Sequence, residues 1–328
     1  MKVILPIQKQ PKILAAFKDG FDTVSKHFYL VLFPVILDLF LLFGVRITIS
    51  DLMHVFIQQL TLPPSATPEL IAGWQTLKSQ LIDYFQVFSL TSFLRSFPVG
   101  IPSLFSKVAF QRNPLGDFHF IQIQQPGAIL LAMLGFSILG LLAAYLFYHL
   151  IARASAKQEL AASPTPVLHS LAAWFLIPVM TTLIASLVFF PVLFMISLIG
   201  AFFPIFTSFG YFLLTIAAIS LITPVFFTPH LIHLEKIDFF RALIASFRTF
   251  RLTNPKSTTF LFLAIAVSYF TDMLWRIPEE DSWMLLISVL GHALISTIIL
   301  AASFHYCLSA RESVREFNEN QMSESILA

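Results

Sequence analysis

Two ionisable side chains stand inside apolar stretches and are the strongest candidates for chemistry in this sequence. Asp38 lies near the middle of residues 28–47, and His292 lies inside residues 283–308. A charge at the centre of a bilayer costs about 3 kcal/mol or more, so such residues face protein and often mark proton or ion pathways. We predict that Asp38 faces the interior with His292 as its partner, and burial favours the protonated carboxyl group. The alternative is a structural hydrogen bond from Asp38 to a Ser, Thr or backbone group on another helix.

Two further sets of residues have spacings that allow a polar site. Asp272 precedes Arg276 by four residues, which predicts an ion pair on one helix face near the outer surface. His230 and His233 lie one helical turn apart with Glu235 beyond them, a spacing that allows a metal site. At a helix end, however, His more often caps carbonyl groups or contacts lipid headgroups.

Motifs of soluble enzymes are missing from the sequence. It has no H-E-x-x-H, G-x-S-x-G, Walker A or G-x-G-x-x-G pattern. The single cysteine, Cys307, excludes an intrachain disulfide and any site built from several Cys. We therefore expect no cofactor.

The elements that must position these residues are membrane helices. Residues 160–234 hold no Lys, Arg, Asp or Glu, and the whole chain is 57% hydrophobic and 12% charged, against about 25% charged in soluble domains. About 20 apolar residues cross a bilayer, so this uncharged stretch is long enough for two crossings. The net charge of +2 gives no reason to expect a nucleic-acid partner.

Apolar segments predict an all-α polytopic membrane protein that forms a single domain over residues 1–328. The expected spans are 28–47, 127–150, 170–199, 204–232, 257–276 and 283–308. Between the first two, residues 50–126 form a helical excursion outside the cell. Within it, the Pro- and Gly-broken apolar run 97–104 is expected to dip into the outer interface or to cap the bundle.

Two amphipathic segments are expected to lie along the membrane surface. Residues 1–27 carry five Lys, and residues 235–256 carry Arg241, Arg248 and Arg251 beside an apolar stripe. That stripe consists of Phe240, Leu243, Ile244, Phe247 and Phe250. For residues 1–27, an ordinary surface helix packed on the bundle is equally compatible with the pattern.

A short motif recurs in these two segments. Ala16, Gly20 and Thr23 repeat at the same spacing as Ala242, Ser246 and Thr249. Both a parallel internal repeat and chance similarity between amphipathic helices explain this, and chance is favoured.

Basic residues set the expected orientation. With six spans, one side of the membrane receives fourteen Lys and Arg and the other receives six. The positive-inside rule then places both termini in the cytoplasm of a multi-pass inner-membrane protein.

The run Asp238-Phe-Phe-Arg-Ala242-Leu-Ile-Ala-Ser246-Phe247-Arg248, followed by Asn254 and a span, resembles a recurring element of bacterial six-span families. One is the membrane domain found beside glycerophosphodiester phosphodiesterases, and others are uncharacterised. The resemblance implies a six-span bundle with an interfacial helix. The 328 residues leave no room for a phosphodiesterase barrel, so no catalytic residue is carried over.

Three classes of function are compatible with these patterns. The leading one is a non-enzymatic scaffold or accessory protein that binds lipid or a membrane-protein partner. The second is a transporter of a small solute or lipid that uses Asp38, and the third is an intramembrane enzyme. Membrane lipids are the expected partners, and the sequence does not define an oligomeric state.

Overall fold

Long apolar helices make up most of the computed structural model, which describes residues 10–63, 65, 67–105, 112–156 and 167–327. Five helices are each long and apolar enough to cross a membrane. They are Pro126–Ser155, Leu168–Gly200, Ile205–Leu234, Lys256–Trp275 and Leu285–Ser323. The chain is therefore a multi-pass membrane protein of all-α class, as predicted.

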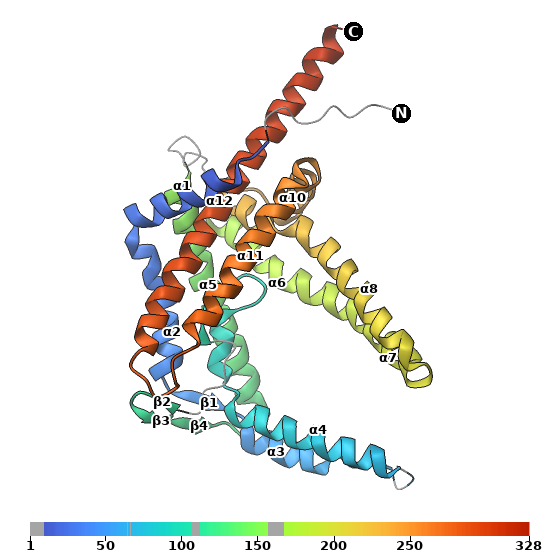
Figure 1. The fold of residues 1–328 in the computed structure, drawn as a ribbon. Helices are drawn as coiled ribbons and strands as arrows, with labels where there is room; N and C mark the ends of the chain where they lie inside the picture. Colours follow the sequence, from blue (N-terminus) through green and yellow to red (C-terminus); the bar gives the residue numbers. More distant parts are fainter. Residues whose placement is uncertain (1–9, 64, 66, 106–111, 157–166, 328) are drawn as a thin grey trace.

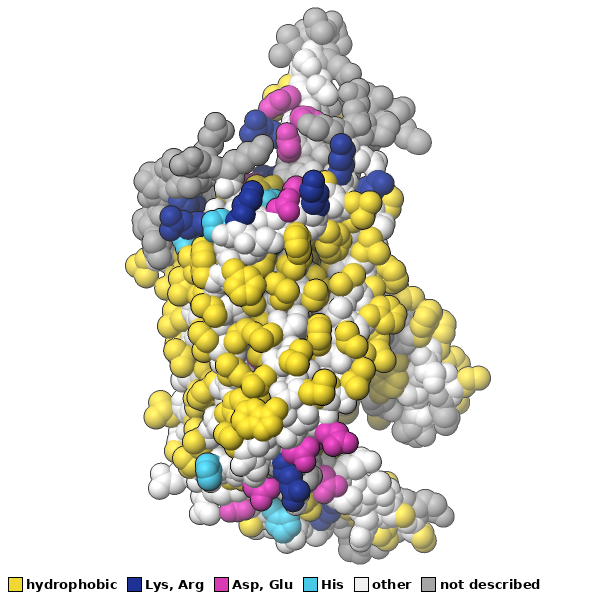
Figure 2. Space-filling view, turned by 60° about the vertical axis from the view of Figure 1, so that its left-hand side comes forward, with side chains coloured by type: hydrophobic (Ala, Val, Ile, Leu, Met, Phe, Trp, Pro, Cys, Tyr) yellow, Lys and Arg dark blue, Asp and Glu magenta, His cyan; other side chains and the backbone are white. Residues whose placement is uncertain are grey.

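The centre of the molecule is a bundle around one long helix. Helix α12 (Leu285–Leu327) contacts α2 (Leu32–Phe43), α5 (Pro126–Ser155) and α11 (Lys256–Trp275) (Figure 1). The C-terminal part of α12 projects beyond the bundle at one end, named here the α12 end. The opposite end carries four short strands and is named the strand end. Figure 2 shows hydrophobic side chains over the middle of one face, with charged side chains gathered towards its two ends.

The predicted first span is shorter than expected. Helix α1 (Ile13–Lys26) is followed by the 3₁₀ turn Phe28–Val31 and α2, and the chain bends by 94° between them. If α1 and the segment Phe28–Phe43 are taken together as one bent span, the number of candidate spans is six. The prediction of one span over 28–47 is wrong at its far end, because helix α2 stops at Phe43. Strand β1 (Arg46–Thr48) follows and pairs with β4 (Phe120–Gln122), which satisfies backbone groups outside the helix.

An apolar hairpin leaves the bundle near the α12 end. Helix α6 (Val167–Ile184), a π turn (Ala185–Phe189) and α7 (Phe190–Phe202) lead outwards, and α8 (Pro204–Ile222) returns. The most apolar parts of both arms contain no buried residue. In a bilayer such side chains contact lipid, which is as apolar as a helix partner, so an arm can stand apart from the bundle without a hydrophobic penalty.

The strand end holds the predicted excursion. Helices α3 (Ser50–Gln59) and α4 (Pro68–Val87) pack against each other and extend sideways. Thr67 caps α4 by accepting a hydrogen bond from the backbone N–H of Leu70, as its position before Pro68 indicates. Strands β2 (Arg112–Asn113) and β3 (Gly116–Asp117) form a small hairpin beside them.

Residues 89–105, named here the inward segment, pass from this excursion into the bundle. The 3₁₀ helix Leu90–Arg95 packs on α5, and Gly140 lies about halfway along α5. A Cβ atom on Gly140 would lie only 2.2 Å from the carbonyl oxygen of Leu94, so the backbone of the segment rests directly on that helix. The segment thus reaches further than the interface or cap expected for residues 97–104.

Helices α1 and α10 (Phe239–Thr253) both pack on α12 through small residues. The recurring positions are all buried: Ala16, Gly20 and Thr23 in α1, and Ala242, Ser246 and Thr249 in α10. The aromatic residue next to each central position points outwards, with Phe21 55% exposed and Phe247 52% exposed. Both motifs are therefore buried beside an exposed aromatic residue, but Gly20 packs against Ala302 whereas Ser246 bonds to Pro224 and Phe227.

Part of the predicted apolar stripe of α10 faces away from the protein. Phe240, Ile244 and Phe247 are exposed, whereas Phe250 is buried. The face of α10 that carries the small residues packs inwards. On this face, Ser246 Oγ donates to the Pro224 carbonyl at 2.6 Å and accepts from the Phe227 N–H at 3.1 Å. These bonds tie α10 to the break between α8 and α9 (Thr228–Leu234).

Candidate functional site

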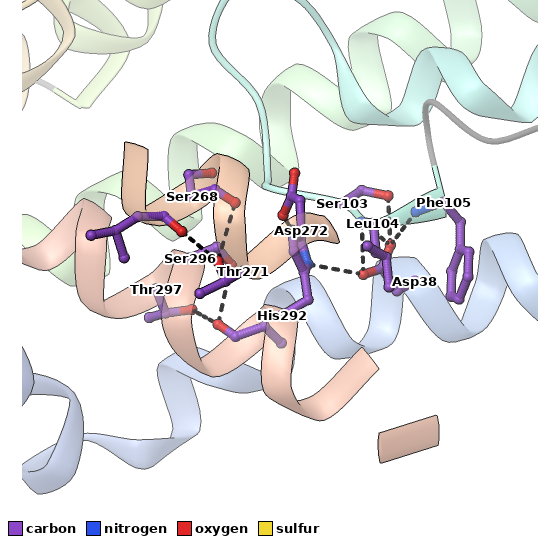
Figure 3. A network of polar contacts seen from close by, with 12 residues as sticks. Asp38, Ser103, Leu104, Phe105, Ser268, Thr271, Asp272, His292, Ser296 and Thr297 are labelled. Atoms are coloured by element: carbon purple, nitrogen blue, oxygen red, sulfur yellow. Dashed lines mark hydrogen bonds and ion pairs between the residues drawn. The ribbon is translucent and has the colours of Figure 1, made fainter. Parts of the chain in front are cut away.

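Asp38 on α2 is fully buried and holds the inward segment. Its Oδ1 accepts from Ser103 Oγ at 2.5 Å and from the N–H groups of Leu104 and Phe105 at 3.0 and 3.4 Å, while Oδ2 lies 3.1 Å from the Leu104 nitrogen (Figure 3). Backbone N–H groups can only donate, so they stabilise an ionised carboxylate.

His292 on α12 lies between two carboxylates. Its Nδ1 is 3.4 Å from Asp38 Oδ2, and its Nε2 is 3.4 Å from Asp272 Oδ1. The side chain of His292 is 7% exposed and that of Asp272 on α11 is 21% exposed. At 3.4 Å these are ion-pair contacts rather than well-formed hydrogen bonds, and Nδ1 makes no hydrogen bond of standard geometry. The structure thus brings Asp38 and His292 together and adds Asp272; these three residues are the Asp–His–Asp cluster.

Arg95 brings a positive charge to the same region. It ends the 3₁₀ helix of the inward segment, and its electrostatic neighbours are Asp272, Asp38 and Tyr148. Burial lowers the pKa of Arg95, and these neighbours raise it. Arg95 belongs to residues 50–126, which were expected to form an excursion outside the cell. The fold carries it inwards, because the inward segment packs on α5.

The predicted outer ion pair between Asp272 and Arg276 is wrong. Across the described part of the chain, no ion pair joins them, and Asp272 contacts His292 instead. Helix α11 ends at Trp275, so Arg276 lies past the last turn and outside the helical register that an i, i+4 pair requires. The Trp275 ring covers Gly291, the residue before His292.

His230, His233 and Glu235 do not form a metal site. His230 Nε2 contacts Ser303 Oγ at 2.6 Å, and Glu235 pairs with Arg311. Within the described ranges, no three His, Cys, Asp or Glu side chains are placed to hold a metal ion. The spacing along the chain was compatible with a site, but each side chain has a different environment.

His233 is enclosed by aromatic rings near the α12 end. Its ring centroid lies 4.9 Å from that of Trp174, 5.0 Å from Tyr145 and 6.0 Å from His149. Neither ring nitrogen of this buried residue has a hydrogen-bond partner. The surrounding rings fill its space, so this cluster packs the junction of α5, α6 and α9.

The three basic residues of α10 remain on the surface. Arg241 pairs with Asp238, which caps the helix by accepting from the Arg241 N–H at 3.0 Å, and this bond holds the pKa of Asp238 below its usual value. Arg248 donates to Asn318 Oδ1 at 2.8 Å. Arg241, Arg248 and Arg251 are all exposed beside the outward-facing aromatic residues of the helix.

Sequence reasoning missed three parts of this site: Arg95, the donors Ser103 to Phe105, and the role of Asp272. The Pro- and Gly-broken run 97–104 was the only signal that this region leaves regular helix. No family model, curated protein or solved structure matches the chain.

Proposed function

We propose that this protein is a non-enzymatic accessory protein of the inner membrane that binds anionic lipid on its cytoplasmic side. The observation that carries the proposal is the shared design of α1 and α10. Each helix buries small residues against the rest of the protein and leaves large apolar residues and basic residues exposed. An apolar face flanked by Lys and Arg is the pattern of helices that lie at an anionic lipid surface.

The orientation is part of the proposal. Helices α1 and α10 lie at the α12 end, together with the C-terminal part of the chain. Lys18 and Lys26 on α1 and Lys12 just before it are exposed at this end, as are the three arginines of α10. The positive-inside rule supports placing this end in the cytoplasm.

Lipid binding is tested by titrating the purified protein with phosphatidylglycerol and with phosphatidylcholine and recording native mass spectra. Each basic residue near an anionic surface contributes about 1 kcal/mol. The triple variant Arg241→Gln, Arg248→Gln, Arg251→Gln is therefore expected to bind phosphatidylglycerol about 100-fold more weakly.

The matched control removes three basic residues at the strand end. Lys78→Gln, Arg112→Gln and Arg276→Gln together change the net charge equally and are expected to leave phosphatidylglycerol binding unchanged. Equal binding of the two lipids by the wild type, or full retention of affinity in the α10 triple variant, contradicts the proposal.

A small-solute transporter is the second candidate, and one specific observation favours it. Asp38, His292, Asp272 and Arg95 meet inside the bundle, and ionisable groups inside membrane proteins often form ion or proton pathways. Against it, Asp38 is already occupied by four hydrogen-bond contacts from the inward segment. Proteoliposomes under a pH gradient that show no proton flux would remove a proton-coupled transporter from consideration.

A further inference from the structure

The imidazole of His292 faces a carboxylate on both sides. Nδ1 lies 3.4 Å from Asp38 Oδ2, and Nε2 lies 3.4 Å from Asp272 Oδ1. Figure 3 shows the ring on α12 reaching towards Asp38. The side chain is almost completely buried, so water does not replace these contacts.

This geometry favours two protons on the ring. A neutral imidazole carries hydrogen on one nitrogen and a lone pair on the other. In either tautomer, the bare nitrogen would face a carboxylate oxygen and be repelled. The donors from Ser103, Leu104 and Phe105 stabilise a carboxylate at Asp38, which favours placing the second proton on the ring rather than on Asp38.

Charge balance points the same way. The described charged and titratable groups that face the cluster are Asp38 from α2, Asp272 from α11, Arg95 from the inward segment and Tyr148 from α5. Two carboxylates and one guanidinium leave a net charge of −1. An imidazolium at His292 brings this to zero, and uncompensated charge is expensive in a buried site.

We propose that His292 is a proton-binding site, an imidazolium held between the carboxylates of Asp38 and Asp272 that exchanges its proton through Asp272. Asp272 is the exit because it is partly exposed, whereas Asp38 is fully buried. In the release step, the His292 Nε2–H bond breaks and an O–H bond forms at Asp272 Oδ1. Asp272 then passes the proton to water, and His292 keeps its Nδ1–H towards Asp38.

Arg95 adds a positive charge that interacts with both carboxylates of the cluster. This charge offsets part of the negative charge of the two carboxylates. The inference goes beyond lipid binding and does not depend on it, and it names the ion that the transport candidate would use.

The test is the protonation state of the ring, read from ¹⁵N NMR of histidine-labelled protein in nanodiscs. The His292 signals are assigned by their loss in His292→Gln. In the wild type at pH 7, both ring nitrogens are expected at the shifts of protonated nitrogen. In Asp272→Asn, Nε2 is expected to move to the shift of a bare nitrogen.

Two variants keep this test decisive. Asp281→Asn removes a carboxylate from the exposed loop before α12 and is expected to leave the His292 signals unchanged. Asp272→Glu keeps the carboxylate and is expected to restore the doubly protonated ring. A bare ring nitrogen in the wild type, or an imidazolium that persists in Asp272→Asn, overturns the proposal, whatever the lipid measurements give.

Discussion

Asp38 shows how a single carboxylate in an apolar helix can be stabilised without water. Desolvation alone opposes its charge, but three donors from consecutive residues converge on it from the inward segment. Hydrogen bonds to a charged group contribute about 1.5–3 kcal/mol each. The residue that first looked like a candidate for chemistry is thus also the anchor of a long-range contact.

Substitution at Asp38 separates the loss of charge from the loss of all acceptors. Asp38→Asn keeps one carbonyl oxygen but turns an amide NH₂ towards a donor or towards His292, so it should lower the free energy of unfolding by about 1.5–3 kcal/mol. Asp38→Leu leaves the N–H groups of Leu104 and Phe105 without an acceptor and should cost more than Asn. Denaturant unfolding in detergent micelles measures both, with Asp281→Asn as the exposed control. A Leu variant as stable as the wild type would show that Asp38 is not an anchor.

Some features of the helices could be predicted from the local sequence, and others could not. The starts of α4 and α10 are marked by the capping residues Thr67 and Asp238, whose side chains each accept a backbone hydrogen bond from the first turn. The outward face of α10 could not be foreseen, because the sequence does not show that Ala242 and Ser246 give the closer packing against the protein. The path of the inward segment was also hidden, since it depends on contacts with α5 and α2 far along the chain.

The close contact between the inward segment and α5 leads to a prediction about how these two elements pack. Gly140→Ala places a Cβ atom 2.2 Å from the Leu94 carbonyl oxygen, and that oxygen belongs to backbone rather than to a flexible side chain. The segment must shift, and this strains the hydrogen bonds that Ser103, Leu104 and Phe105 donate to Asp38. We expect Gly140→Ala to lower the unfolding temperature by several degrees.

Gly135→Ala on the same helix is the matched control. A Cβ atom at position 135 meets no other atom within 4 Å, and alanine is a better helix former than glycine. This variant is expected to be as stable as the wild type or slightly more stable. If the two variants behave alike, the inward segment does not rest on α5.

For the whole molecule, composition was enough to predict the membrane class and the approximate positions of most spans. Within the uncharged stretch, residues 167–222 form the hairpin of α6 to α8, which turns between Phe202 and Pro204, where the expected spans 170–199 and 204–232 meet. Its separation from the bundle was not predictable, because apolar residues suit both lipid and protein neighbours. Only part of the site could be predicted. The contact between Asp38 and His292 was predicted because both residues lie well inside their spans, whereas Asp272 and Arg95 reach the site through tertiary packing.

The proposed topology places the strand end outside the cell, and the turn between α3 and α4 gives a direct test. Ser65 is exposed in this turn, at the end of the molecule away from the C-terminal part of α12. Ser65→Cys should react with a membrane-impermeant maleimide in intact cells, because the six basic residues on its side are too few to retain that side in the cytoplasm.

Asn320→Cys, exposed on α12, should react only after lysis. The native Cys307 is buried, so the unmodified protein gives the background. Labelling of Asn320→Cys in intact cells, with Ser65→Cys protected, would invert the topology and move the proposed lipid contact to the outer leaflet.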